Sequence, residues 1–345
     1  MIQHQHAFSL KDGRMVEEYT LERGSLRVTV LNLGATLTGI YCPDRMGKVE
    51  NILIGYAQAE DYADNQPFFG TTVGPMSGRI SGGAFEIDGH HYVLEQNFKS
   101  HNLHGGSQGF HSYVWQPTTE EKEEEDRLTL MAFHADGVGG FPGNLMVKVH
   151  YVLRDNELVI EYEATTDKPA LINMTNHAYF NLSGDGKRTV ADHRLVLPAS
   201  KYGQVNGDTL PNGPWAPVEG TAMDFRYGKR LDEVLTSDEP QIALCGGLDH
   251  PFLLDDEGEV SLYESKSGRN IIMSTNQPAV VVYTMNGVDG LKGMNTSIPV
   301  EAHHGICLEV QDPPNAVNHP HFDFTPVTPE APYHRLTTLR FEVKR

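Results

Sequence analysis

Hydrophobic and polar residues alternate along many short stretches of this chain, as they do in β-strands that have one buried face. The clearest example is residues 145–153 followed by residues 158–164, where apolar side chains recur at every second position on both sides of a short turn. This pattern predicts an antiparallel hairpin. Glu161 and Glu163 fall on its polar side and are expected to face solvent.

The same alternation predicts further strands, and little of the chain has the pattern of a helix. Residues 26–30 and 35–41 predict two strands joined by a turn at residues 32–34. Residues 57–64 and 231–236 are compatible with short helices at most. Many short strands separated by Gly, Pro, Asn and Asp turns predict an all-β protein, a large antiparallel β-sandwich with few short helices.

One stretch, residues 171–184, combines the period of a strand with hydrogen-bonding side chains. Its apolar positions predict a half-buried strand, but Asn176, His177 and Asn181 interrupt them. A buried amide or imidazole without a partner costs about 1 to 3 kcal/mol, so these groups need a polar network or a ligand. His177 is therefore either a core histidine bonded to a backbone carbonyl or a group that transfers protons near neutral pH.

Three charged residues stand in apolar or glycine-rich surroundings and have two interpretations each. Glu309 interrupts the apolar strand predicted for residues 305–311, and it either points to solvent or faces a site where burial raises its pKa. The spacing alone favours the solvent side. Asp249 either caps a turn or belongs to a site. Arg79, among the glycines of residues 70–89, is compatible with a polar ligand site, although a surface arginine in a flexible hairpin is favoured.

Metal and disulfide sites are not favoured by the remaining residues. His101 and His104 are three residues apart, but the glycines that follow them indicate a loop, and no acidic or cysteine ligand lies beside them. The acidic run at residues 118–127 is most simply a solvated hairpin tip. The three cysteines are far apart and form no C-x-x-C pair, which indicates neither a disulfide framework nor a zinc site: Cys42, Cys245 and Cys307.

Length and charge limit the possible partners. The 345 residues allow several domains or one large all-β domain, and no stretch has the composition of a linker, so we expect a single domain over residues 1–345. A formal net charge of −19 opposes binding to the phosphates of nucleic acids and to anionic membranes. The N-terminus has no signal-peptide pattern and no apolar run is long enough to span a bilayer, which predicts a cytoplasmic protein. The sequence leaves open whether it is a monomer or a homodimer.

Four short segments resemble, in order, those of a known family. They are residues 102–106 (NLHGG), 175–182 (TNHAYFNL), 247–250 (GLDH) and 308–311 (LEVQ). Together they are similar to the aldose 1-epimerase (galactose mutarotase) family. The resemblance implies a single-domain galactose mutarotase-like supersandwich, no cofactor, and interconversion of the α and β anomers of free sugars such as galactose, glucose and maltose.

The resemblance also implies roles for individual residues. Glu309 matches the general base of the family and His177 its general acid, while Arg79, His104 and Asp249 match residues that line its sugar site. The reaction needs such a pair, because the hemiacetal opens when the C1 hydroxyl loses a proton and the ring oxygen gains one.

Two positions depart from the family pattern and leave the preferred sugar open. Gly78 stands where asparagine is common, and Val281 stands where many members have glutamine. Two alternatives therefore remain beside the epimerase of free sugars. One is a non-catalytic sugar-binding or regulatory protein on the same fold. The other is a hexose-6-phosphate 1-epimerase, which would need extra basic residues at its site.

Overall fold

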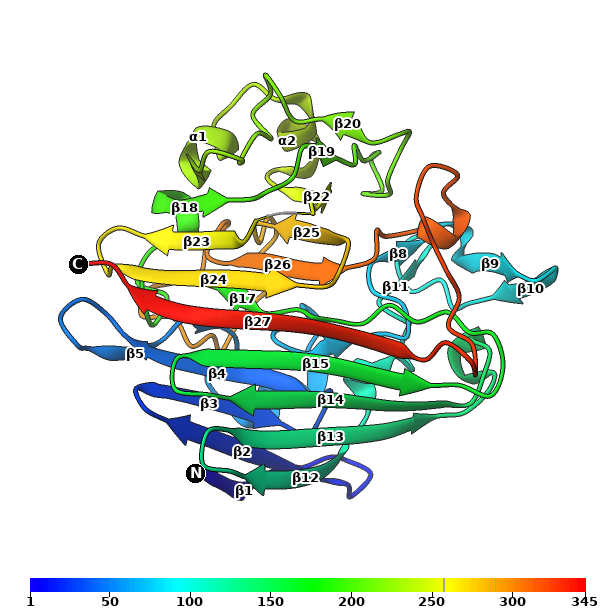
Figure 1. Ribbon diagram of the computed structural model, residues 1–345, viewed down its shortest axis with the longest axis horizontal. Coiled ribbons are helices and arrows are strands. Elements are labelled where there is room, and N and C mark those ends of the chain that lie inside the picture. Colours follow the sequence, from blue (N-terminus) through cyan, green and yellow to red (C-terminus); the bar gives the residue numbers. More distant parts are fainter. Residues whose placement is uncertain (257, 289) are drawn as a thin grey trace.

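The computed structural model describes residues 1–256, 258–288 and 290–345, and antiparallel β-sheets dominate it (Figure 1). The largest sheet has nine strands, in the order β12 (Gln116–Glu121), β13 (Asp126–His134), β14 (Leu145–Leu153), β15 (Glu157–Thr165), β27 (Tyr333–Val343), β24 (Arg269–Thr275), β23 (Val260–Glu264), β18 (His193–Val196) and β21 (Lys229–Arg230).

Two further sheets and three strand pairs complete the β-structure. The seven-stranded sheet has the order β20 (Ala216–Pro217), β19 (Lys201–Tyr202), β22 (Asp249–Leu253), β25 (Ala279–Tyr283), β26 (Ile306–Gln311), β17 (Tyr179–Phe180) and β6 (Leu53–Ile54). The five-stranded sheet runs β1 (Ile2–Ser9), β2 (Met15–Arg23), β3 (Leu26–Leu31), β4 (Thr36–Pro43) and β5 (Val49–Asn51). The pairs are β9 (Ala84–Ile87) with β10 (His90–Val93), β8 (Arg79–Ile80) with β11 (Asn102–Leu103), and β7 (Thr72–Val73) with β16 (Thr175–Asn176).

The helices are short. The α-helices are α1 (Leu231–Leu235) and α2 (Pro240–Cys245), and the 3-10 helices are η1 (Ala59–Asp64), η2 (Ser81–Gly83), η3 (Phe110–Ser112), η4 (Val138–Gly140), η5 (Val190–Asp192) and η6 (Ala316–Asn318). None of the helices in the described parts of the chain has both the length and the apolar character that crossing a membrane requires.

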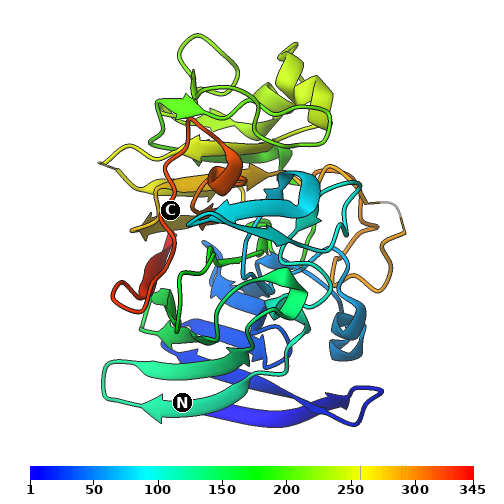
Figure 2. The same ribbon diagram turned by 90° about the vertical axis from the view of Figure 1, so that its right-hand side faces the viewer.

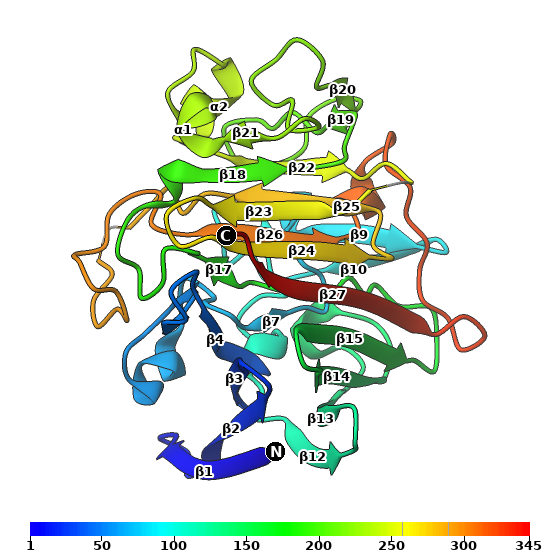
Figure 3. The same cartoon turned by 60° about the vertical axis from the view of Figure 1, so that its left-hand side comes forward.

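The sheets form layers around a shared hydrophobic core. In Figure 3 the strands β1 to β4 lie on one side of the lower half of the molecule and β12 to β15 lie on the other. One cluster of buried side chains connects all three large sheets, since it contains Val28 from β3, Tyr151 from β14 and Leu308 from β26. Burying these apolar faces against one another is what stabilises the layers. The predicted large antiparallel β-sandwich with few short helices is confirmed.

Several local predictions are also confirmed. Strands β3 and β4 cover the stretches predicted at residues 26–30 and 35–41. Strands β14 and β15 form the predicted hairpin, with Leu153 paired with Leu158. The acidic run at residues 118–127 forms the end of the β12 and β13 hairpin. Helices η1 and α1 occupy the two stretches compatible with short helices, whereas α2 was not predicted.

The prediction of one half-buried strand over residues 171–184 is wrong. The stretch forms two strands of two residues each, in different sheets, because β16 pairs with β7 while β17 pairs with β26 and β6. Every residue of the stretch is buried. Asparagine amides replace the missing strand ladder: Asn173 bonds the backbone of Asp312, Asn176 donates to the carbonyl of Gly70, and Asn181 donates to the carbonyl of His304.

Strand β26 is buried on both faces, which prepares the site described next. The residues on one face belong to the hydrophobic core: Ile306, Leu308 and Val310. The other face presents Cys307, Glu309 and Gln311. The segment that follows β26, drawn in orange-red in Figure 2, lies against β9, where the Asn318 amide donates to the carbonyl of Ala84 over 2.7 Å.

Candidate active site

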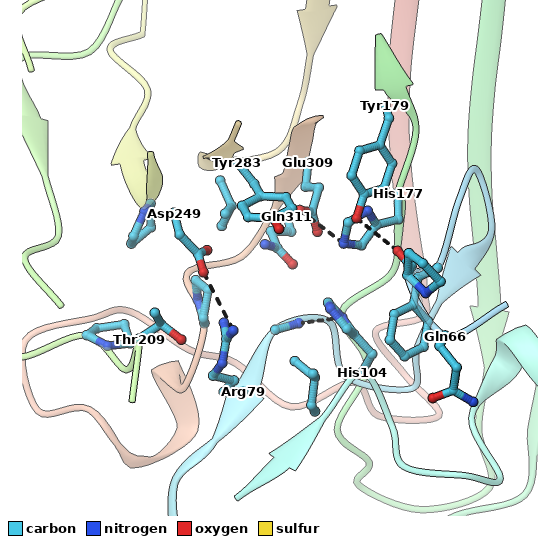
Figure 4. Close-up of a pocket in the computed structure, with 18 residues that line it drawn as sticks. Gln66, Arg79, His104, His177, Tyr179, Thr209, Asp249, Tyr283, Glu309 and Gln311 are labelled. Carbon is cyan, nitrogen blue, oxygen red and sulfur yellow. Dashed lines mark hydrogen bonds and ion pairs between the residues drawn. The ribbon is translucent and has the colours of Figure 1, made fainter. Parts of the chain in front are cut away.

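A cavity of about 210 Å³ opens on the face of the seven-stranded sheet that points away from the core (Figure 4). The five residues predicted for a sugar site come from segments far apart in the sequence, and all of them line this cavity: Arg79, His104, His177, Asp249 and Glu309. The fold therefore brings together side chains that the sequence only indicated separately.

The floor of the cavity is set by the register of three neighbouring strands. In β22, β25 and β26, Pro251 lies opposite Val281, and Val281 lies opposite Glu309. Two residues further along the same strands, Asp249 lies opposite Tyr283. Side chains two residues apart on a strand share a face, so the two carboxylates point into the same space. The favoured interpretation of a solvent-facing Glu309 is wrong, since only 4% of that residue is exposed.

His177 lies between the short strands β16 and β17, and its backbone is held on both sides. Its N–H donates to the carbonyl of Thr71, and its carbonyl accepts from the N–H of Gly70, each over 2.9 Å. The imidazole Nε2 lies 3.5 Å from the Glu309 Oε1 atom, as Figure 4 shows. His177 is thus buried like a core histidine, but its ring faces a carboxylate across the cavity.

The wall opposite the floor comes from the β8 and β11 pair. Gly78, with a φ of +73°, donates its N–H to the His104 Nδ1 atom over 3.2 Å, and its carbonyl accepts from the His104 N–H over 3.0 Å. A neutral imidazole that accepts at Nδ1 carries its proton at Nε2. His104 is therefore a hydrogen-bond donor toward a ligand in the cavity.

Arg79 and Asp249 close the far end of the cavity as a pair. The Arg79 guanidinium lies 3.6 Å from the Asp249 carboxylate and 4.9 Å from the centre of the Phe98 ring. Side-chain exposure is only 18% for Arg79 and 17% for Asp249, so the interpretation of Arg79 as a flexible surface arginine is wrong. Asp249 opens strand β22 and directs its carboxylate at the guanidinium, not at a turn amide.

Burial shifts the proton affinities of Glu309 and His177 in opposite directions. Loss of solvation, together with the nearby charge of Asp249 and partly offset by Arg79, raises the pKa of Glu309 to about 8. Loss of solvation lowers the pKa of His177 to about 4, with a smaller contribution from Arg79 in the same direction. The pKa of His104 is also lowered well below its usual range by burial and by its imidazole neighbour His177.

Three of these groups could also approach one metal ion. One ligand atom each of His104, His177 and Glu309 lies within 4.8 Å of the other two, and two imidazoles with a carboxylate are a familiar zinc set. The pair considered in the sequence, His101 with His104, does not form a site, because the His101 ring lies beside Asp208 at 3.4 Å, outside this cluster. The resemblance implies no cofactor, and an ion held here would occupy both His177 and Glu309.

Several residues that line the cavity were not singled out from the sequence. The main ones are Gln66, Phe68, Tyr179, Thr209, Tyr283 and Gln311. A signal existed for Gln311 and Tyr179, because each stands two residues after a predicted site residue. The loop residues Gln66, Phe68 and Thr209 reach the cavity only through tertiary folding and had no local signal.

The two departures from the family pattern both lie at the cavity. Gly78 and Val281 are lining residues. A Cβ atom at position 78 would come within 2.8 Å of the Pro314 side chain, so a larger residue would require the segment around Pro314 to move. The close approach of Pro314 therefore leaves room only for glycine at position 78. Val281 makes the centre of the cavity floor apolar.

A strand-built cavity in which a buried carboxylate of raised pKa lies beside an imidazole of lowered pKa is typical of the class of enzymes. Comparison with known proteins narrows this class. The sequence model of the family described as "Aldose 1-epimerase" matches residues 17–340. The galactose mutarotase of Rattus norvegicus is 36% identical over 336 residues, covering 96% of this chain and 95% of that protein.

Further relatives agree. The aldose 1-epimerase of Escherichia coli (strain K12) is 34% identical over 317 residues, covering 90% of each chain. The crystal structure of galactose 1-epimerase from Lactobacillus acidophilus NCFM superposes with a TM-score of 0.89 at 32% identity, covering 100% of this chain and 99% of that one. The chain belongs to the aldose 1-epimerase family, and it is an isomerase-type enzyme of carbohydrate metabolism.

Proposed function

We propose that this enzyme interconverts the α and β anomers of free aldoses such as galactose and glucose, with maltose as a further candidate, and that Glu309 is the base and His177 the acid. The observation that supports this assignment is the approach of His177 Nε2 to Glu309 Oε1, 3.5 Å, in a cavity that also presents His104, Arg79 and Asp249. Groups able to donate to and accept from sugar hydroxyls thus surround one proton-transfer pair.

The reaction needs two proton transfers and no net change in atoms. The Glu309 carboxylate takes the proton of the C1 hydroxyl while His177 gives a proton to the ring oxygen, and the C1–O5 bond breaks to leave the open-chain aldehyde. Rotation about C1–C2 exposes the other face of the carbonyl. The ring oxygen then attacks C1, His177 recovers its proton, and Glu309 returns its proton to the new C1 hydroxyl. Each well-placed transfer contributes roughly 10² to 10⁴ in rate.

The pKa shifts suit these roles. A carboxylate whose conjugate acid has a pKa of about 8 is a strong base, and an imidazolium with a pKa of about 4 is a strong acid. In the empty cavity at neutral pH the pair holds one proton, which resides on Glu309. That is also the protonation state of the pair when the aldehyde has formed. A sugar hydroxyl that donates to the carboxylate stabilises its charged form and so helps to place the proton on His177 before the ring opens.

The charge of the cavity favours an unphosphorylated sugar. Arg79 is the one lysine or arginine among the lining residues in the described part of the chain, and the Asp249 carboxylate already faces it. The Asp249 carboxylate would also oppose a phosphate. A hexose 6-phosphate is therefore the less favoured substrate.

Polarimetry tests the proposal directly. The optical rotation of freshly dissolved α-D-galactose, α-D-glucose and α-maltose is followed with and without the enzyme. For at least one of these sugars the enzyme should speed the decay of the rotation, and the final rotation should stay the same for all three. The variant His177→Asn should lower the accelerated rate by roughly 10² or more, since it removes the acid. A correctly folded wild-type protein that accelerates none of these sugars would overturn the proposal.

A further inference from the structure

Gln311 lies at the cavity with a buried amide oxygen that has no hydrogen-bond partner in the described part of the chain. Only 1% of the residue is exposed, and it lines the cavity. Its Oε1 atom is buried and has no hydrogen-bond partner among residues 1–256, 258–288 and 290–345. A buried acceptor without a partner reduces folding stability. An amide in this position needs a partner that is not part of the protein.

The strand places this amide next to the proposed base. Gln311 stands two residues after Glu309 on β26, on the same face, at a distance of about 7 Å along the strand. Its cross-strand neighbour on β25 is Ala279, whose methyl group offers no hydrogen bond. Figure 4 shows the Gln311 side chain at the cavity, near Glu309.

The middle of the floor cannot provide polar contacts beside the base. Val281 and Pro251, the cross-strand neighbours in the row of Glu309, are apolar. Polar contacts on this floor therefore come from the adjacent rows, with Asp249 and Tyr283 on one side and Gln311 on the other. A glutamine amide can both accept from a hydroxyl and donate to one.

We propose that Gln311 binds the sugar hydroxyl at C2 or C3 and is a specificity-determining residue of this enzyme, an inference that rests on the proposed function. With the C1 hydroxyl at Glu309, the hydroxyls one and two ring carbons away are those that come nearest to the next position along β26. Gln311 provides a polar contact on a floor where Val281 provides none.

The first test is removal of the amide by Gln311→Leu and, as a variant closer in length, Gln311→Met. For galactose the KM should rise roughly 3- to 10-fold, the loss expected for one hydrogen bond, while kcat changes less than twofold. The melting temperature should stay equal to that of the wild type or rise, because the substitution removes a buried acceptor that has no partner. A purely structural glutamine would give a lower melting temperature and an unchanged KM, which would overturn the proposal.

Deoxy sugars identify the contact. For the wild type, kcat/KM should be lower with either 2-deoxy- or 3-deoxy-D-galactose than with galactose. The size of this loss should equal the loss of kcat/KM that Gln311→Leu causes with galactose. The variant should show no additional loss with that one sugar, because the interacting hydroxyl is already absent. If the loss of kcat/KM from Gln311→Leu and the loss from removing the hydroxyl simply add in free energy for both deoxy sugars, Gln311 does not bind these hydroxyls and the proposal is wrong.

A second buried glutamine gives a matched control. Gln277 is bonded within the protein, since its Oε1 accepts from the Arg335 guanidinium over 3.0 Å and its amide nitrogen donates to the Met174 carbonyl over 3.4 Å. Gln277→Leu should lower the melting temperature and leave the relative kcat/KM values for galactose and its deoxy forms unchanged. If Gln277→Leu changes that sugar ranking as Gln311→Leu does, the effect is not specific to the cavity amide and the proposal fails.

These measurements separate the inference from the proposed function. A wild type that accelerates none of the sugars contradicts the proposed function. A wild type that accelerates galactose, with a KM that Gln311→Leu and Gln311→Met leave unchanged, contradicts only the role of Gln311.

Discussion

Two buried glutamates, Glu309 in the cavity and Glu50 between the sheets, have opposite electrostatics. Each follows an aliphatic residue in a β-strand, and each is at most 4% exposed. Burial raises the pKa of Glu309 to about 8. Burial also acts to raise the pKa of Glu50, but hydrogen bonds from Lys187, Lys48 and Arg269 outweigh it and lower that pKa to about 2.

The partners explain the difference. Glu50 on β5 lies 3.0 Å from Arg269 on β24, so this ion pair connects the five-stranded sheet to the nine-stranded sheet. Gly184 makes room for the pair, since a Cβ atom there would come within 2.3 Å of the Glu50 carboxylate. Glu309 lies beside His177 and faces the cavity, where Arg79 only partly offsets the effects of burial and of Asp249. Burial among cations leaves a carboxylate with a lowered pKa, and burial beside the cavity leaves one with a raised pKa, which suits the base proposed above.

The largest expected effect is on activity. Glu309→Gln keeps the shape of the side chain and removes the base, so the enzymatic rate should fall by roughly 10² to 10⁴. The free energy of unfolding should be unchanged or higher, because no buried cation loses its partner. Polarimetry and thermal unfolding of the same sample measure both. Wild-type activity in this variant would show that Glu309 is not the base.

For Glu50→Gln we expect the opposite, a loss of stability with little change in activity. Arg269 is 1% exposed and would lose its counter-charge, and breaking a buried pair in this way costs about 3 to 5 kcal/mol of stability. Below the new melting temperature the kcat should remain within a few-fold of wild type, since the ion pair is not at the cavity. Urea unfolding gives the free energy. A loss below about 1 kcal/mol, the range of a surface ion pair, would contradict the structural role.

The pH dependence of activity should show the two shifted pKa values of the cavity pair. The pair needs one proton in total, so kcat/KM should be constant between about 4 and about 8. Below this range both groups are protonated and no base remains. Above it both are deprotonated and no acid remains, and each limb should fall about tenfold per pH unit. A single limb near the ordinary pKa of glutamate would contradict the effect of burial on Glu309.

A smaller effect concerns stability, with opposite signs for the two glutamates. The lowered pKa of Glu50 contributes stability that is present above its ordinary value of 4.5 and is lost as the pH falls toward about 2. The raised pKa of Glu309 means that the folded protein binds this proton more tightly, so stability decreases as the pH rises from 4.5 toward about 8. Glu309→Gln should remove the decrease at high pH and Glu50→Gln the decrease at low pH. Unfolding curves for both variants that keep the pH dependence of the wild type would contradict this account.

Much of the fold was predictable because alternation is a local property. The hairpin of β14 and β15 and the strands β3 and β4 follow from side chains that alternate between core and surface. Residues 171–184 were not predictable in this way. Their asparagine amides bond to backbone groups of distant segments, such as Asp312 and His304, and those bonds replace a regular strand.

The site was partly predictable from the sequence, and the residues that could not be predicted were missed for a physical reason. The ordered segments around His104, His177, Asp249 and Glu309 indicated the chemistry, and the structure adds that these side chains share one cavity. Gln311 could have been found from its spacing to Glu309. The loop residues of the cavity could not, because their contribution depends on how segments far apart in the chain pack.

The sequence by itself determined which side chains are available and which face of each strand they occupy, since both follow from the order of residues. Only the tertiary structure decided which buried glutamate has a raised pKa and which a lowered one. A proton affinity depends on the solvent, charges and hydrogen-bond donors within a few ångströms, and in this protein those neighbours come from distant segments of the chain: Arg269 for Glu50, and His177 for Glu309.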